Sequence, residues 1–234
     1  MKDILVSHLH TDHSHHLTHM KSRANPSVAY IPEEAVENAQ KFIDAAQMMT
    51  SNLSPAECSQ IEWDVALKFT GVRPGQRINL SRKGLVCDIV ECDHGVPCVG
   101  FIVSRLKTSL KPELKGLSGR EIGKLRKEGV RLADEFCERL FCFLGDTTAD
   151  ILKPDAEYSQ AILSCPTVII ECSFLTDEFK NNAARTKHVL WSDLKPIVQA
   201  NPATTFVLTH FSHRYSVAQV KSLLREDALP NVVP

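Results

Sequence analysis

The segment Ser7-His8-Leu9-His10-Thr11-Asp12-His13 carries the strongest signal in this sequence, and it directly follows the short apolar run Ile4–Val6. The apolar run predicts a buried strand, with the polar segment as the loop at its end. Histidine and carboxylate side chains together suit borderline divalent ions such as zinc, manganese or iron. Four potential ligands within six residues exceed what one tetrahedral site could easily collect from a single loop, so the segment predicts two adjacent metal ions. The alternative is a histidine-rich tract that binds metal loosely, because His15, His16 and His19 follow at once.

Three further metal-competent side chains follow other predicted strands. A histidine-rich tract that arose by chance would not be accompanied by such residues at three strand ends. Active sites on sheets gather where strands end and loops begin, so this placement favours one shared pocket. The three side chains are His94 after Leu85–Val90, Asp146 after Leu140–Leu144, and His210 after Thr204–Leu208.

The remaining apolar pattern mixes strands with helices. A helix is expected from Pro32 to about residue 49, and Ser216 with Gln219 forms a capping box that predicts a helix near the end of the chain. Such a mixture predicts a layered α/β (α+β) architecture. Further strands are expected at Val96–Val103, at Thr167–Ile170 and along the alternating segment Ile61–Phe69, which ends in a turn at residues 71–75.

Composition limits the class of protein. The 234 residues carry 27 Lys and Arg against 28 Asp and Glu, and 43% of the residues are hydrophobic, which suits a single globular domain over residues 1–234 and excludes a disordered chain. No apolar run reaches the roughly 18 residues needed to span a membrane.

The eight cysteines include no C-x-x-C pair and are expected to be reduced and buried. With no long apolar stretch of a secretory signal at the N-terminus, the expected location is the cytoplasm or the nucleus.

Positive charge is concentrated in residues 105–131. This segment has nine basic and three acidic residues, a net charge of +6, whereas the other 207 residues have a net charge of -7. A net charge of -1 for the whole chain gives no global attraction to nucleic acid, so a polyanion would have to meet this local patch. The alternative is a solvated, charged helix face.

The ordered pattern H-x-H-x-D-H, then His, then Asp, then His resembles that of the metallo-β-lactamase superfamily. Four other segments resemble motifs of tRNase Z, the endonuclease family that trims tRNA 3′ ends, and the similarity runs from about residue 3 to the C-terminus. It is nearest to the short, plant-like form of that family. The four segments are Asp93–Phe101, Phe143–Thr148, Ile170–Leu175 and Leu208–Tyr215.

The resemblance implies an αββα sandwich that holds two divalent metal ions, with zinc expected. It assigns His8, His10 and His94 to one ion, Asp12, His13 and His210 to the other, and Asp146 as a bridge. It further implies phosphodiester hydrolysis by a hydroxide held between the metals and oriented by Asp12, with His188, supported by Glu171, as the proton donor. From residue chemistry alone, Glu171 could equally be a surface carboxylate and His188 a polar residue at a helix start.

By the same resemblance, the chain would be an endoribonuclease that removes the 3′ trailer from precursor tRNA and leaves a 3′-hydroxyl. Residues 105–131 would form an inserted arm that grips tRNA phosphates, and the protein would be a homodimer in which one subunit's arm holds the tRNA cut by the other. No membrane partner is implied. The residues expected to contact tRNA are Lys115, Arg120, Lys124, Arg126, Lys127 and Arg214.

The chain departs from the family at its beginning, because the family has several strands before the metal motif. The expectation is therefore a sandwich that lacks its first strands. Two alternatives to tRNA processing remain open at this point. One is hydrolysis of a small phosphodiester or a thioester by the same centre, and the other is a non-catalytic metal- or RNA-binding homologue.

Overall fold

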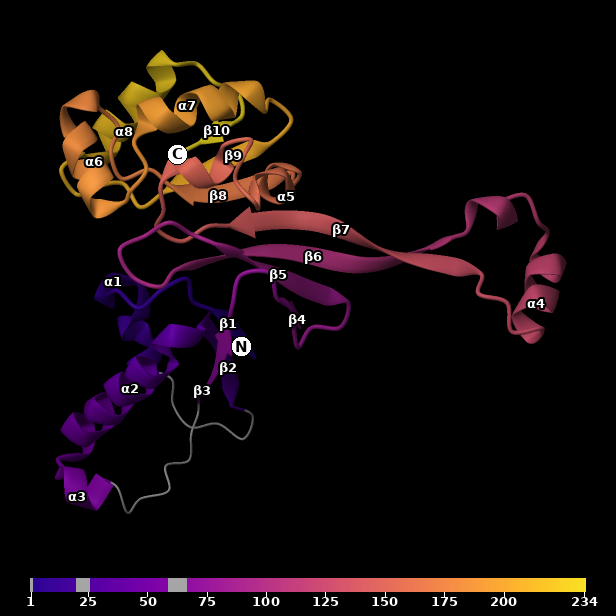
Figure 1. Cartoon of the computed structure of the whole chain (residues 1–234), viewed down its shortest axis with the longest axis horizontal. Coiled ribbons are helices and arrows are strands. Elements are labelled where there is room, and N and C mark those ends of the chain that lie inside the picture. Colours follow the sequence, from indigo (N-terminus) through magenta and orange to yellow (C-terminus); the bar gives the residue numbers. More distant parts are fainter. Residues whose placement is uncertain (1, 20–25, 59–66) are drawn as a thin grey trace.

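The computed structural model describes residues 2–19, 26–58 and 67–234, and two β-sheets stacked face to face form its centre (Figure 1). The smaller sheet is parallel, in the order β1-β2-β3. Its strands are β1 (Asp3–Leu5), β2 (Ser27–Pro32) and β3 (Leu67–Val72). Successive side chains of a strand point to opposite faces. Accordingly, Ile4 and Val6 pack on one side of β1 and Leu5 packs on the other.

The larger sheet has seven strands in the order β10-β9-β8-β7-β6-β5-β4. Neighbours from β4 to β7 are antiparallel, and those from β7 to β10 are parallel. The strands are β4 (Arg77–Asn79), β5 (Leu85–Glu91), β6 (Val99–Leu110), β7 (Ala133–Phe143), β8 (Thr167–Glu171), β9 (Thr205–Thr209) and β10 (Val232–Val233).

Helices cover the outer faces of both sheets. The core between the sheets contains Cys87, Ile89 and Phe101, packed against Leu5 and Tyr30. On the outside of the smaller sheet lies α2 (Val36–Ser51), and on the outside of the larger sheet lie α5 (Ser159–Leu163), α7 (Trp191–Ala200) and α8 (Val217–Glu226). The αββα sandwich predicted from the motifs is therefore confirmed.

Short helices occupy the connections. In the part of the chain that the structure describes, no helix is both long and apolar enough to cross a membrane. The remaining helices are α1 (Thr11–Ser14), η1 (His15–His19), η2 (Glu33–Ala35), α3 (Pro55–Cys58), η3 (Pro112–Leu114), α4 (Gly119–Lys127), η4 (Ala149–Leu152), η5 (Asp177–Phe179) and α6 (Lys180–Thr186).

An arm leaves the sandwich where β6 and β7 extend beyond the end of β5. β5 pairs with β6 only as far as Arg105, but β6 and β7 stay paired out to Leu110 and Ala133. A register shift between Val103 and Ser104 marks the place where the ribbon departs, as β-bulges commonly do. The ribbon carries η3 and α4 at its tip (Figure 1). The arm covers the basic segment 105–131 that the sequence singled out.

Most predicted elements have close counterparts, with shifts at their ends. The run Val96–Val103 corresponds to β6, which begins later and continues into the arm. Pro32 is the last residue of β2 rather than the first of a helix, and α2 begins at Val36. Of the alternating segment Ile61–Phe69, residues 61–66 lie outside the described residues, and Leu67 begins β3.

Candidate metal centre

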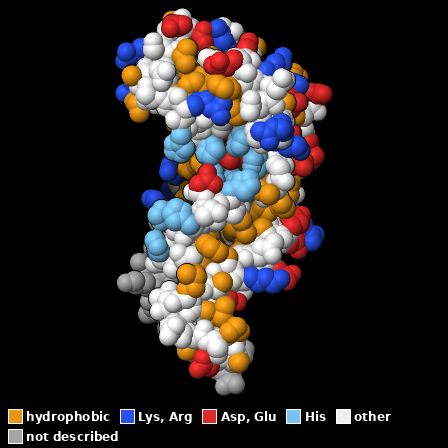
Figure 2. Space-filling view, turned by 90° about the vertical axis from the view of Figure 1, so that its left-hand side faces the viewer, with side chains coloured by type: hydrophobic (Ala, Val, Ile, Leu, Met, Phe, Trp, Pro, Cys, Tyr) orange, Lys and Arg blue, Asp and Glu red, His pale blue; other side chains and the backbone are white. Residues whose placement is uncertain are grey.

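The seven predicted ligands meet at one edge of the two sheets. They lie on loops at strand ends, or on the short helix α1 that follows β1. Figure 2 shows histidine side chains gathered on this face of the molecule, with carboxylate side chains beside them. The positions are His8 and His10 after β1, Asp12 and His13 in α1, His94 between β5 and β6, Asp146 after β7, and His210 after β9.

Three histidines form one half of the centre. The Nε2 atom of His8 lies 3.1 Å from Nδ1 of His10, and Nε2 of His94 lies 3.3 Å from that same Nδ1. The Oδ2 atom of Asp146 is 3.6 Å from Nε2 of His8 and 3.9 Å from Nε2 of His94. Three nitrogens and a carboxylate oxygen thus face one small space.

Two histidines and Asp12 form the other half. The Nε2 atoms of His13 and His210 are 3.2 Å apart, and Oδ2 of Asp12 lies 3.4 Å and 3.5 Å from them. The Oδ2 atom of Asp146 is also within reach, 3.5 Å from His13 and 3.6 Å from His210. One oxygen of the Asp146 carboxylate therefore lies between the two groups.

The electrostatics suit a cation at this place. Burial, reinforced by the neighbouring histidines, lowers the pKa of His8 to about 3, so its imidazole is neutral and has a free lone pair. Burial raises the pKa of Asp12, but His13 and nearby hydrogen bonds outweigh this and leave the pKa below its usual value. Neutral imidazoles beside ionised carboxylates are the donor set that zinc and similar divalent ions prefer. The residues present can bind metal.

Several of these histidines are oriented through the ring nitrogen that faces away from the centre. A hydrogen-bond partner on that outward-facing nitrogen fixes the tautomer of the ring and the direction of its other nitrogen. Sequence reasoning did not identify the three partners, because they act through serine hydroxyls or a backbone carbonyl. The contacts are Ser7 Oγ with His8 Nδ1 at 3.1 Å, the Lys187 carbonyl oxygen with His94 Nδ1 at 3.1 Å, and Ser173 Oγ with His210 Nδ1 at 3.0 Å.

Glu171 and His188 form a buried pair beside the centre. Glu171 is only 1% exposed, which rules out the surface carboxylate considered from the sequence, and its Oε1 lies 2.6 Å from Nδ1 of His188. The backbone N–H groups of Thr147 and Ser173 donate to the same carboxylate at 3.1 Å and 3.0 Å. Burial lowers the pKa of His188, but the bond to Glu171, with its charge and that of Asp146, raises it overall above the usual value.

His188 could also be grouped with the ligands by distance alone. Its Nδ1 atom is 3.9 Å from Oδ2 of Asp146, and its ring stacks on that of His210 with centroids 5.4 Å apart. The much shorter contact of Nδ1 with Glu171 favours a hydrogen bond to that carboxylate over a role as a metal ligand at this atom.

The extra histidines of the first motif do not join the centre. His15, His16 and His19 lie exposed on η1, and the rings of His15 and His16 are 3.9 Å apart. Among the described residues, the groups of three or more metal-competent side chains include none of the three. The three histidines therefore lie together on η1, apart from the metal centre.

The residues expected to contact tRNA divide between two places. Arg214 lies close to the centre, where its guanidinium sits 4.1 Å from the ring centroid of Phe179 and 5.1 Å from that of Phe174. The ring of Phe174 is in turn 6.3 Å from that of His188. The other five lie on the arm with exposed side chains; they are Lys115, Arg120, Lys124, Arg126 and Lys127.

The sequence is similar to plant tRNase Z proteins. It is 26% identical over 226 residues to the chloroplastic tRNase Z TRZ2 of Arabidopsis thaliana, covering 94% of this chain and 60% of that protein. It is also 26% identical over 233 residues to tRNase Z TRZ1 of the same plant, covering 97% of this chain and 78% of TRZ1. The chain thus spans about 60% of the length of TRZ2. No family model matches the sequence.

Solved structures share the fold. The metallo-β-lactamase fold protein YhfI from Bacillus subtilis superposes with a TM-score of 0.59 at 14% identity, covering 100% of this chain and 74% of YhfI. Human tRNase Z, short form, superposes with a TM-score of 0.53 at 18% identity, covering 92% of this chain and 73% of the human chain. The chain therefore shares the fold of metallo-β-lactamase fold proteins, and its sequence is similar to tRNase Z proteins.

Proposed function

We propose that this chain is a metal-dependent endoribonuclease that removes the 3′ trailer from precursor tRNA. The observation that carries the proposal is the constellation around Asp146. Seven nitrogen and oxygen donors converge there, and the buried pair of Glu171 and His188 lies against them. The similarity to tRNase Z proteins supplies the substrate class.

The proposed cofactor is a pair of zinc ions. His8, His10 and His94 would hold one ion, Asp12, His13 and His210 the other, and the carboxylate of Asp146 would be shared, since its Oδ2 faces both groups. Two such cations would lower the pKa of water and absorb the negative charge that develops on the phosphate.

The side chains around the ligands have separate tasks in this proposal. The Asp12 carboxylate, 68% exposed, can accept a proton from the attacking water and orient it toward the phosphorus. When the bond from phosphorus to the 3′-oxygen breaks, that oxygen needs a proton. His188 can supply it from Nε2, because Glu171 accepts a hydrogen bond from Nδ1 and raises the pKa of the imidazole above its usual value.

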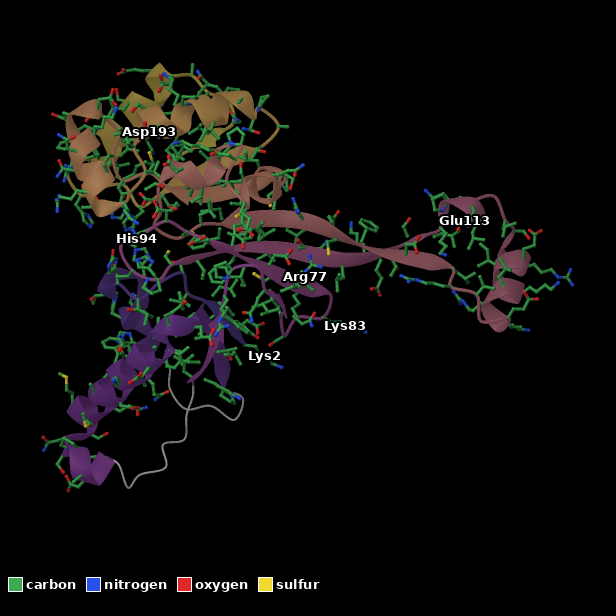
Figure 3. The ribbon with its side chains drawn as sticks, viewed as in Figure 1. Lys2, Arg77, Lys83, His94, Glu113 and Asp193 are labelled. Carbon is green, nitrogen blue, oxygen red and sulfur yellow. The ribbon has the colours of Figure 1, made fainter. Side chains whose placement is uncertain are left out.

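The arm is the proposed tRNA-binding element. Its exposed Lys and Arg side chains would neutralise phosphates without reading base sequence, which suits an enzyme that accepts every tRNA. Figure 3 shows His94, at the metal centre, and Glu113, in the arm, at opposite ends of the molecule. We therefore propose a homodimer in which each arm holds the tRNA that the partner subunit cuts, with Arg214 contacting the phosphate backbone beside the centre.

A cytosolic or nuclear location is proposed from the cysteines. The seven whose side chains the structure describes are all free thiols, and six of them are buried. Reduced thiols of this kind are typical of those compartments.

Cleavage of a defined transcript tests the proposal. Purified protein loaded with zinc should cut a 3′-extended precursor tRNA once, after the mature 3′ end, and leave a 3′-hydroxyl on the tRNA. His10→Ala and Asp146→Ala should lower the rate by at least about a thousandfold, because each removes a donor from the shared centre. Asp150→Asn, an exposed carboxylate four residues from Asp146, should cut normally. Full-rate cleavage by Asp146→Ala would refute the mechanism.

A second experiment distinguishes tRNA from a small phosphodiester as the substrate. Lys124→Gln, Arg126→Gln and Lys127→Gln together should weaken tRNA binding in a salt-dependent way and leave hydrolysis of bis(p-nitrophenyl) phosphate unchanged. The control is Lys221→Gln with Arg225→Gln, exposed basic residues on α8. Equal losses on both substrates would count against a dedicated tRNA-binding arm. Tight metal binding without turnover of either would favour a non-catalytic homologue.

A further inference from the structure

Lys187 touches both functional parts of the site. Its carbonyl oxygen accepts a hydrogen bond from Nδ1 of His94 at 3.1 Å, and the next residue in the chain is His188. The orientation of this one peptide therefore bears on a proposed metal ligand and on the proposed proton donor at the same time.

The backbone at Lys187 has an uncommon conformation. Lys187 ends α6 with φ 52° and ψ 56°, which is the left-handed region, and its N–H donates to the carbonyl of Ala183. Residues other than glycine keep this conformation only where the surroundings hold it in place. Contacts of the Lys187 side chain can restrain this backbone conformation.

Asp93 receives the side chain of Lys187. Its Oδ1 accepts a hydrogen bond from Nζ of Lys187 at 2.7 Å, and its Oδ2 accepts one from Oγ1 of Thr148 at 3.2 Å. The backbone N–H of Asp93 donates to Oγ1 of Thr147 at 3.0 Å. Asp93 precedes His94, and Thr147 follows Asp146, so this carboxylate connects the loops that carry both of these donors to the loop of His188.

We propose that the ion pair of Asp93 and Lys187, here called the latch, is a positioning device for the metal centre. It fixes the peptide of Lys187, so that the carbonyl oxygen holds Nδ1–H of His94 and leaves Nε2 directed at His10 and Asp146. The same peptide also positions the backbone of His188. The latch deepens the proposed function and rests on it for the identity of the reaction.

The exposure of the Asp93–Lys187 pair distinguishes a positioning role from a contribution to folding stability. The side chains of Asp93 and Lys187 are each 46% exposed, and exposed ion pairs add little to folding stability. Loss of the latch should therefore leave thermal unfolding of the metal-free protein nearly unchanged. What it should change is how tightly the centre holds metal and how fast the bound substrate reacts.

The test uses three substitutions in the full chain. Asp93→Asn and Lys187→Gln remove the ion pair, and Lys187→Gly removes it while favouring the left-handed backbone. Each should lose zinc roughly tenfold more readily to a chelator such as 4-(2-pyridylazo)resorcinol, at the low end of the range for lost outer partners of a metal ligand. Each should also lower kcat on precursor tRNA by a similar factor, with KM within about twofold of the parent because the arm is untouched. Lys187→Arg should keep both properties.

Three outcomes of these measurements would overturn the latch. Unchanged zinc retention in Asp93→Asn and Lys187→Gly would overturn the latch, as would Lys187→Arg behaving like Lys187→Gln. A raised KM with normal zinc retention in Lys187→Gln would instead make this lysine a phosphate contact, which also overturns it. The matched control is Asp150→Asn, which removes an equally short exposed pair between Asp150 on η4 and Lys153 at its end. Because zinc retention needs no RNA, the latch can be judged even if the parent protein fails to cut precursor tRNA.

Discussion

Gly145 allows the loop that carries Asp146 to touch the loop that carries His8. A Cβ atom at Gly145 would lie 2.4 Å from Cβ of Ser7 and 2.7 Å from Sγ of Cys98, which is closer than real Cβ contacts. We expect Gly145→Ala to force the two loops apart, to weaken zinc retention at least about tenfold and to destabilise the protein by about 1–3 kcal/mol. Chelator competition and thermal unfolding measure the two effects.

Gly95 provides the control for this substitution. It lies next to His94, and a Cβ atom there would meet no heavy atom within 4 Å. Gly95→Ala should therefore leave zinc retention and stability as they are. If Gly145→Ala behaved the same way, the close approach of the two loops would not matter for the centre.

At the scale of single residues, the sequence predicted the metal donors but not the groups that hydrogen-bond to the donor histidines and orient them. His94, Asp146 and His210 could be found because each follows an apolar strand, where side chains of different strands meet. Ser173 and Lys187 could not, because nothing in their residue types marks a hydroxyl or a carbonyl that will face a histidine ring. Such contacts depend on how the loops fold. The only available signal was that Ser173 lies two residues after Glu171 and that Lys187 directly precedes His188.

Helices α7 and α8 are connected by Asp227, which caps the end of α8. Its Oδ2 accepts a hydrogen bond from Nε1 of Trp191 at 2.6 Å, and its Oδ1 pairs with Nζ of Lys195. Hydrogen bonds from Lys195 and then Trp191 lower the pKa of Asp227, although partial burial opposes this. A carboxyl group whose pKa is lower in the folded state stabilises the fold above its unfolded pKa, and that contribution disappears as the pH falls through the folded pKa.

We therefore expect Asp227→Asn to lower the free energy of unfolding by about 1 kcal/mol at pH 7. The difference from the parent should shrink as the pH falls below about 4, where the carboxylate of the unfolded parent is protonated. Urea unfolding between pH 3 and pH 7 measures it, with Asp150→Asn as the exposed control. A difference that stayed constant with pH would show that the charge of Asp227 is not the cause.

At the scale of elements, apolar runs located β5 to β9 of the larger sheet, but the short strands β4 and β10, β2 and the outer ribbon of the arm were not predicted. β2 was not predicted, because Ser27–Pro32 is short and its last residue, a proline, suggested a helix start. The outer ribbon of the arm was not predicted as paired strands either. Its residues from 106 to 110 and from 133 to 137 are mostly exposed or half-exposed and include charged side chains, so they lack the apolar pattern of a strand buried in a core.

The whole molecule places its two functional parts far apart. β6 begins near the loop of His94 and runs for 12 residues toward the arm, which is roughly 40 Å at about 3.3 Å per residue. The helix α4, with Lys124, Arg126 and Lys127, lies beyond that end (Figure 1). An arm directed away from its own metal centre is better placed to hold a substrate for another copy of the chain, as the proposed homodimer requires.

This arrangement predicts complementation between two impaired variants. One carries Asp146→Ala and keeps its arm, and the other keeps its metal centre but carries Lys124→Gln, Arg126→Gln and Lys127→Gln. After equal amounts are mixed and allowed to exchange subunits, half of the dimers are mixed, and each has one intact centre facing one intact arm. Cleavage of precursor tRNA should therefore recover to about a quarter of the parent rate.

The same mixture distinguishes the competing arrangement. If each arm served the centre of its own chain, no subunit in the mixture would have both parts, and activity would stay at the level of the separate variants. Size-exclusion chromatography with light scattering must show dimers before and after mixing, and a tagged subunit must show that exchange has occurred. Exchanged dimers without recovered cleavage would contradict the arm acting on the partner subunit, and the metal centre would then have to meet its tRNA without it.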